Sequence, residues 1–123
     1  HEICRECDFI SLHLPLTAQT RHLIGSEELA MMKNNAILIN TARGGIVDED
    51  ALLDALSSGS IRGAGVDAFV NEPPNDPRWF RLDNVVLGNH AAASTVGAAN
   101  AMSMMAACNL LDDLGRDEGS TPC

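Results

Sequence analysis

The chain is organised around the stretch Asn40-Thr41-Ala42-Arg43-Gly44-Gly45-Ile46-Val47-Asp48. It follows the short apolar run Ala36-Ile37-Leu38-Ile39, which is typical of a strand in a buried parallel sheet. A helical pattern begins at its last residue, so Arg43 lies between a strand and a helix. Open α/β sheets bind ligands at this edge, and a guanidinium there can hold a carboxylate through two hydrogen bonds. Taken alone, an Arg-Gly-Gly run after a strand is more often a solvated loop.

The predicted elements alternate between strands and helices. Strands are expected within residues 8–13, 36–40, 61–67 and 84–87, and helices within residues 1–7, 26–33, 48–59 and 94–114. We expect Ser26 and Asp48 to cap the second and third helices at their N-termini, and Gly59 to end the third in a left-handed conformation. Residues 115–123 are expected to form a frayed tail. This order predicts an α/β fold with a parallel sheet.

The last predicted helix carries apolar residues around most of its circumference. Either Ser94 or Thr95 is expected to cap its N-terminus. A helix that is apolar on most sides is buried on most sides. We therefore expect a long buried C-terminal helix, packed against a surface that this chain alone need not supply.

The composition narrows the classes of partner. The 123 residues suffice for one domain with a core, and 17 acidic against 8 basic residues give a formal net charge of −9. This charge repels nucleic acid and anionic lipid, so neither is an expected partner. No apolar run approaches the ~20 residues that cross a bilayer, and no N-terminal segment resembles a secretory signal. We therefore expect a cytoplasmic protein.

Two of the four cysteines, Cys4 and Cys7, have the spacing of a metal-binding or redox pair. No second pair and no nearby histidine completes a zinc site. The pair also precedes a strand, whereas a thioredoxin-like pair lies between a strand and a helix. Reduced thiols and the absence of a metal site are the expected interpretation.

Four polar residues follow predicted strands: Arg43, then Asp67 and Glu72, then His90. The carboxyl ends of parallel strands share one edge and lie about 5 Å apart, so these side chains should form one rim. Histidine can act as acid and base near neutral pH, and a neighbouring carboxylate favours its charged form. Each residue also has a plainer interpretation, as part of a proline-rich loop, a helix entry or a turn cap. Together they predict an acid–base site beside a bound carboxylate.

At these residues the sequence resembles the D-isomer-specific 2-hydroxyacid dehydrogenases, a family of NAD(P)-dependent enzymes. The Asn-Thr-Ala-Arg-Gly-Gly run is specific to that family, and the resemblance extends over the chain up to its tail. The other matching runs are residues 12–17 with Thr20, 32–33, 63–69, 72–74, 84–87 and 90–95.

The resemblance implies a role for each site residue. His90 would exchange a proton with the substrate hydroxyl, Glu72 would pair with His90, and Arg43 would bind the substrate carboxylate and polarise its carbonyl. Asp67 would bond the carboxamide of the nicotinamide, which Arg43 and His90 would border. The remaining cofactor-binding residues implied are Leu14, Pro15, Thr20, Thr41, Ala42, Ala92 and Ala93.

The resemblance also implies which part of a fold this is. Residues 1–93 correspond to the second half of a Rossmann-like doubly wound parallel sheet, in the NAD(P)-binding domain. Residues 94–123 correspond to a helix and tail that return toward a substrate domain. The 123 residues contain no Gly-x-Gly-x-x-Gly, so the pyrophosphate site and the choice between NAD and NADP are expected upstream. We expect a piece of a longer enzyme that is inactive alone and prone to aggregate or domain-swap.

The activity implied is the interconversion of a small D-2-hydroxy acid and its 2-keto acid, with NAD or NADP, by a homodimer. The loop sequences are most similar to those of the phosphoglycerate, hydroxypyruvate or glyoxylate branch of the family. Asn89 replaces the usual proline, which is expected to loosen the loop before His90. Ala92 and Ala93 replace glycines, which is expected to make the nicotinamide pocket slightly tighter. The alternative is a nucleotide-sensing interaction protein, because the C-terminal-binding protein corepressors resemble the same family.

Overall fold

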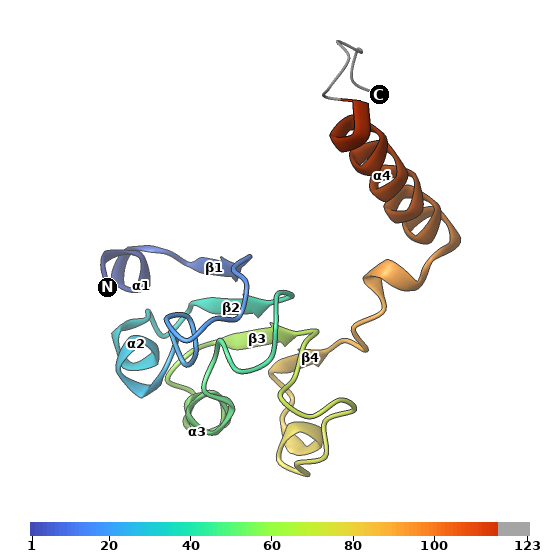
Figure 1. The fold of residues 1–123 in the computed structure, drawn as a ribbon. Coiled ribbons are helices and arrows are strands. Elements are labelled where there is room, and N and C mark those ends of the chain that lie inside the picture. The colour runs from blue at the N-terminus through green and yellow to red at the C-terminus, as the bar shows by residue number, and fades with distance from the viewer. Residues whose placement is uncertain (116–123) are drawn as a thin grey trace. The chain divides into compact units, whose positions relative to one another are not determined.

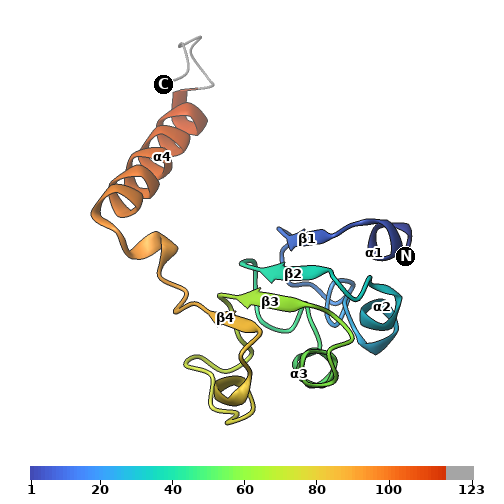
Figure 2. The same cartoon turned by 180° about the vertical axis from the view of Figure 1, so that it is seen from behind.

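The computed structural model describes residues 1–115, which divide into two compact units, one ending at His90 and the other starting at Ala91. The first unit is a four-stranded parallel sheet with helical connections (Figures 1 and 2). Its strands are β1 (Phe9–Leu12), β2 (Ile37–Asn40), β3 (Gly63–Val66) and β4 (Val85–Leu87), in that order across the sheet. Its helices are α1 (Glu2–Glu6), α2 (Ser26–Met31), α3 (Glu49–Ser58) and the 3-10 helix η1 (Trp79–Arg81). The predicted parallel α/β fold is confirmed.

The strands end together at one edge of the sheet. Leu12 is paired with Asn40, Asn40 with Val66, and Val66 with Leu87. These are the last residues of the four strands, and the arrowheads of β1, β2 and β3 point the same way in Figure 1. The four loops that follow therefore start side by side, as predicted for the polar residues that follow the strands.

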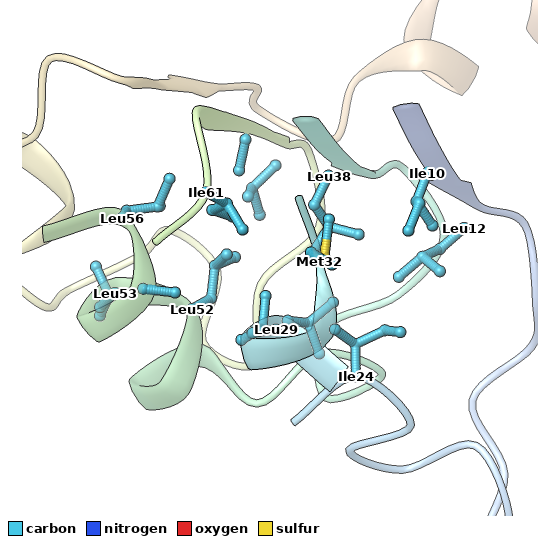
Figure 3. Close-up of a cluster of buried hydrophobic side chains, with 14 of the residues drawn as sticks. Ile10, Leu12, Ile24, Leu29, Met32, Leu38, Leu52, Leu53, Leu56 and Ile61 are labelled. Atoms are coloured by element: carbon cyan, nitrogen blue, oxygen red, sulfur yellow. The ribbon is translucent and has the colours of Figure 1, made fainter. Parts of the chain in front are cut away.

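The core lies between one face of the sheet and the helices. Figure 3 shows Ile10 and Leu38 from the strands packed toward Leu29 and Leu52 from α2 and α3. Burial alternates along β1 and β2, so only one face of each strand is covered, and Phe9 on the other face of β1 is 68% exposed. Each fully buried leucine stabilises the fold by roughly 1.5–3 kcal/mol relative to an exposed one.

The observed cap residues match the predicted ones at α3 and differ from the predicted one at α2. The Asp48 side chain accepts a hydrogen bond from the Ala51 N–H, and Gly59 adopts φ 71°, both as predicted. At α2 the N-cap is Gly25, and Ser26 is the first helical residue, so the prediction of a Ser26 cap is wrong. The Glu28 carboxylate reaches back and accepts a hydrogen bond from the Gly25 N–H at 3.1 Å, which satisfies the backbone donor of the N-cap residue.

The segment between β3 and β4 is anchored by its single tryptophan. Trp79 is 1% exposed and packs edge-on against Phe69, with ring centroids 5.6 Å apart. Arg78 forms ion pairs with Asp76 in the same segment and with Asp50 in α3. A proline-rich stretch thus has fixed ends, which matters because it carries Glu72.

The second unit contains the 3-10 helix η2 (Ala92–Ser94) and the helix α4 (Val96–Gly115). Thr95, one of the two predicted caps, accepts a hydrogen bond from the Ala98 N–H at 3.1 Å. None of the residues of α4 is buried, so the expected burial is not found within residues 1–115. The tail predicted for residues 115–123 lies, apart from Gly115, outside the described residues.

Among residues 1–115, no helix has both the length and the apolar character that crossing a bilayer requires.

Candidate active site

The loop after β2 is shaped by a buried asparagine and a glycine. Asn40 is 3% exposed; its side-chain oxygen accepts from the Ala42 N–H at 3.1 Å, and its amide donates to the Arg43 carbonyl at 3.0 Å. A Cβ on Gly44 would lie 2.1 Å from the backbone of Phe69, so only glycine allows the two loops to approach this closely. The sequence Asn-Thr-Ala-Arg-Gly therefore holds Arg43 in a fixed turn at the end of the strand.

Arg43 borders two pockets. One, of about 650 Å³, lies along the ends of β1 and β2; the other, of about 410 Å³, extends toward the loops after β3 and β4. The guanidinium Nη1 donates to the Ala42 carbonyl at 2.7 Å. The side chain is exposed, so its remaining donors can reach a ligand in either pocket.

His90 and Glu72, eighteen positions apart in the chain, are in direct contact. The Nδ1 atom of His90 lies 2.8 Å from Oε1 and 3.0 Å from Oε2 of Glu72. An ionised carboxylate can only accept, so Nδ1 carries the proton and Nε2 is left to exchange one. Both residues line the 410 Å³ pocket together with Arg43. The three predicted catalytic side chains therefore meet at one pocket.

The Glu72 carboxylate is held in its charged form. The backbone N–H of Phe69 donates to Oε1 at 3.1 Å, and this bond, followed by the bond from His90 and the charge of Arg43, lowers the pKa of Glu72 below its usual value of 4.5. Because its pKa is lowered, Glu72 is ionised at neutral pH, and it orients His90. The peptide bond from Glu72 to Pro73 is cis.

Asp67 supports the backbone of His90. Its Oδ1 accepts from the His90 N–H at 3.0 Å, and a Cβ on Gly88 would lie 1.9 Å from the same oxygen. His90 has φ 52°, a left-handed conformation that is uncommon outside glycine and costs about 1–3 kcal/mol. A residue held in such a conformation by a dedicated hydrogen bond is typical of functional sites. The predicted contact of Asp67 with a carboxamide stays a prediction.

The 650 Å³ pocket contains most of the predicted cofactor residues of the first unit. Leu14, Pro15, Thr41 and Ala42 line it, which gives an apolar wall on one side and the start of the Arg43 turn on the other. Thr20 is not part of that lining; its hydroxyl donates to the Pro15 carbonyl at 2.7 Å and so holds the loop in shape. Ala92 and Ala93 belong to the second unit, and their predicted contacts with a cofactor stay predictions.

Sequence reasoning missed three groups at the site. Arg21 lines the 410 Å³ pocket from the loop after β1. Like Arg43, it follows a strand of the parallel sheet, and its position after a strand is the signal that could have identified it. Glu49 binds the Val70 N–H from the first turn of α3, and the Phe69 N–H binds Glu72. The last two are contacts of side chains with backbone atoms, for which the sequence carries no signal.

The site can transfer a proton beside a bound anion. A charged carboxylate fixes the histidine, the histidine presents Nε2, and a guanidinium on the same pocket suits a carboxylate. The adjacent larger pocket is within the usual size range for small-molecule sites, which is about 300–1,000 Å³.

Comparison with known proteins matches most of the chain to one family. Residues 1–92 match the model of a family described as D-isomer specific 2-hydroxyacid dehydrogenase, NAD binding domain. The chain is 50% identical over 107 residues to a D-3-phosphoglycerate dehydrogenase of Methanocaldococcus jannaschii, covering 87% of this chain and 20% of that protein. It is 50% identical over 109 residues to a glyoxylate reductase of Thermococcus litoralis, covering 89% of this chain and 33% of that protein.

Solved structures share the fold. The glyoxylate/hydroxypyruvate reductase of Sinorhizobium meliloti, described as NADPH-dependent and crystallised with NADP and malonate, superposes with a TM-score of 0.83 at 35% identity. The match covers 99% of this chain and 37% of that one. The chain therefore spans between a fifth and a little over a third of the length of these three proteins.

Proposed function

The chain belongs to the D-isomer specific 2-hydroxyacid dehydrogenase family, and from that premise we propose that it forms the acid–base part of an NAD(P)-dependent oxidoreductase. The reaction is the interconversion of a D-2-hydroxy acid and its 2-keto acid. The single observation that carries this proposal is the convergence of Arg43, Glu72 and His90 on one pocket. A bound nicotinamide supplies the hydride donor or acceptor.

His90 acts as the acid and base. With Nδ1 engaged by Glu72, Nε2 gives a proton to the carbonyl oxygen during reduction and takes it from the hydroxyl during oxidation. The charge of Glu72 stabilises the imidazolium that forms during oxidation. This pair thus keeps one ring orientation through both directions of the reaction.

Arg43 holds the substrate. Its guanidinium binds the carboxylate of the 2-keto acid and stabilises the negative charge that develops on the carbonyl oxygen. Because the side chain borders both pockets, a substrate held there lies next to the cofactor pocket and within reach of His90. Leu14, Pro15, Thr41 and Ala42 would hold the cofactor through apolar and backbone contacts, with Thr20 shaping their loop and Ala92 and Ala93 closing over the nicotinamide.

The chemistry of the residues fits the cofactor in part. The 650 Å³ pocket offers apolar walls for a nucleoside, whereas the 123 residues contain no glycine-rich phosphate loop. We therefore expect the 123-residue polypeptide on its own to show no turnover, and to aggregate or domain-swap. Our proposal further includes a boundary near residue 93, a homodimer and a cytoplasmic location. The expectation of no turnover is supported by the relatives, which are named as enzymes and are about three to five times as long as the matched region.

The test uses the protein in the full length that its gene encodes. Purified protein is assayed with glyoxylate and hydroxypyruvate, each with NADH and with NADPH, by the loss of absorbance of the reduced cofactor. We expect reduction of at least one keto acid, and a loss of about 10²–10⁴-fold in kcat for His90→Ala. Undiminished turnover in that variant would overturn the assignment of His90. Cofactor binding without turnover of any keto acid would instead favour a nucleotide-sensing protein, for which no residue described above gives specific support.

A further inference from the structure

We propose that Arg21 is a specificity-determining residue, which binds a second anionic group, a phosphate or a carboxylate, at the end of the substrate remote from its 2-keto acid. This inference rests on the proposed function and adds a substrate class to it.

Arg21 completes the ring of loops around the acid–base pocket. Each of the four strands is followed by a loop that lines the 410 Å³ pocket, and Arg21 is the charged residue from the loop after β1. Arg43, Glu72 and His90 come from the loops after β2, β3 and β4. The pocket therefore contains two guanidinium groups, and only one of them has a role in the reaction proposed above.

The loop holds Arg21 in place through its backbone. The Arg21 N–H donates to the Thr17 carbonyl at 3.0 Å, and the His22 N–H donates to the Gly45 carbonyl at 2.8 Å. His22 adopts φ 51°, a left-handed conformation that turns the chain immediately after Arg21. A Cβ on Gly45 would lie 3.5 Å from Nη1 of Arg21, which places this guanidinium against the backbone two residues beyond Arg43.

The charge of Arg21 is uncompensated at the pocket. Within residues 1–115 its side chain has neither a hydrogen bond nor an ion pair. Glu72 is the carboxylate on this pocket, and it is already bound by the Phe69 N–H and by His90. In a chain of net charge −9, this is a local concentration of positive charge. Such a site attracts and orients an anion.

The size of the pocket agrees with a longer substrate. Glyoxylate, the smallest 2-keto acid, has its single carboxylate on Arg43 and leaves most of 410 Å³ unfilled. A substrate with a second anion reaches both guanidinium groups and fills more of the space. Arg21 then discriminates between substrates through a charge-assisted hydrogen bond that the smaller acid cannot make.

The experiment compares specificity ratios in the full-length protein. For each variant, kcat/KM is measured with 3-phosphohydroxypyruvate, with 2-oxoglutarate and with glyoxylate, and the first two values are divided by the third. We expect the wild-type ratio to exceed one for at least one of the two substrates that carry a second anionic group, and the larger ratio identifies phosphate or carboxylate as that group. In Arg21→Gln that ratio should fall by about tenfold or more, the loss typical of a hydrogen bond between charged groups.

Arg62→Gln is the matched control. Arg62 is an exposed arginine directly before β3, at the opposite end of the strand from the pocket, and its substitution should leave the ratio unchanged. The role of Arg21 would be overturned, while the proposed function stands, by an Arg21→Gln ratio equal to wild type, by an equal fall in Arg62→Gln, or by no preference for a substrate with a second anionic group. If the wild type reduces no keto acid at all, the proposed function fails, and this inference fails with it.

Discussion

The carboxylate of Glu49 accepts a hydrogen bond from the backbone N–H of Val70 at 2.6 Å. Glu49 lies in the first turn of α3, and Val70 lies two residues before Glu72. The contact joins the helix that follows the Arg43 turn to the loop that carries the acid–base carboxylate. Burial raises the pKa of Glu49, and the bond from Val70 opposes that rise.

Replacing Glu49 tests how firmly the Glu72 loop must be held. Glu49→Ala removes the acceptor, so we expect a loss of about 1 kcal/mol in the free energy of unfolding and a lower kcat. Glu49→Gln keeps an oxygen acceptor and should retain most of both. Urea unfolding and steady-state kinetics measure the two effects. Identical behaviour of the alanine and glutamine variants would show that the contact with Val70 is unimportant.

The raised pKa of Glu49 also predicts a pH dependence of stability. A carboxyl whose pKa is higher in the folded state favours folding when protonated, and that contribution is lost as the pH rises through its folded-state pKa. Glu49→Gln cannot ionise. Its stability relative to wild type should therefore increase as the pH rises above about 4.5, the ordinary value. A constant difference between the two proteins across that range would contradict the prediction.

Substituting Glu72 should move the pH dependence of catalysis. The Phe69 N–H and His90 keep the pKa of Glu72 below its usual value, so its charge is present throughout the neutral range and is lost only in acid. Glu72→Gln has no carboxyl to protonate and loses the charged partner of the His90 ring. We therefore expect a lower kcat at neutral pH, and no loss of activity in acid of the kind that protonation of Glu72 causes in wild type. Glu27→Gln, an exposed change in α2, should leave the profile in place.

Asp67 should matter for the position of His90. Asp67→Ala removes the acceptor for the His90 N–H and leaves a left-handed backbone conformation without support. We expect kcat to fall with little change in the global unfolding midpoint, because the contact is exposed and local. Asp67→Asn keeps an acceptor oxygen and should retain more activity. Equal activity in the two variants would contradict a positioning role.

Gly44→Ala should separate the loops that carry Arg43 and Glu72. The added Cβ would meet backbone atoms of Phe69 and Val70 at 2.1–2.4 Å, so the backbone of one of the two loops must shift. Overpacking of this kind costs about 1–3 kcal/mol. Gly97→Ala is the control, since a Cβ there meets nothing within 4 Å. Thermal unfolding of both variants decides the prediction, which fails if Gly44→Ala is as stable as wild type.

Much of the fold could be predicted from local pattern. The apolar run before Asn40 predicts β2, and Asp48 and Gly59 predict both ends of α3, because strand burial and helix capping depend on neighbours in sequence. The cap of α2 could not be predicted, because Gly25 has no side chain that signals a cap and its N–H is bound by the Glu28 carboxylate instead. The burial of α4 depends on a packing surface, which a helical pattern requires but does not identify.

For the site, the sequence by itself determined which groups follow the strands: an arginine, two carboxylates and a histidine, at one edge of a parallel sheet. Only the tertiary structure decided what those groups contact. It pairs Glu72 with His90, directs Asp67 to the His90 backbone and adds Arg21 to the pocket. The physical reason is range. Periodicity and capping act over a few residues, whereas these contacts join loops that the strand register brings together from distant parts of the chain.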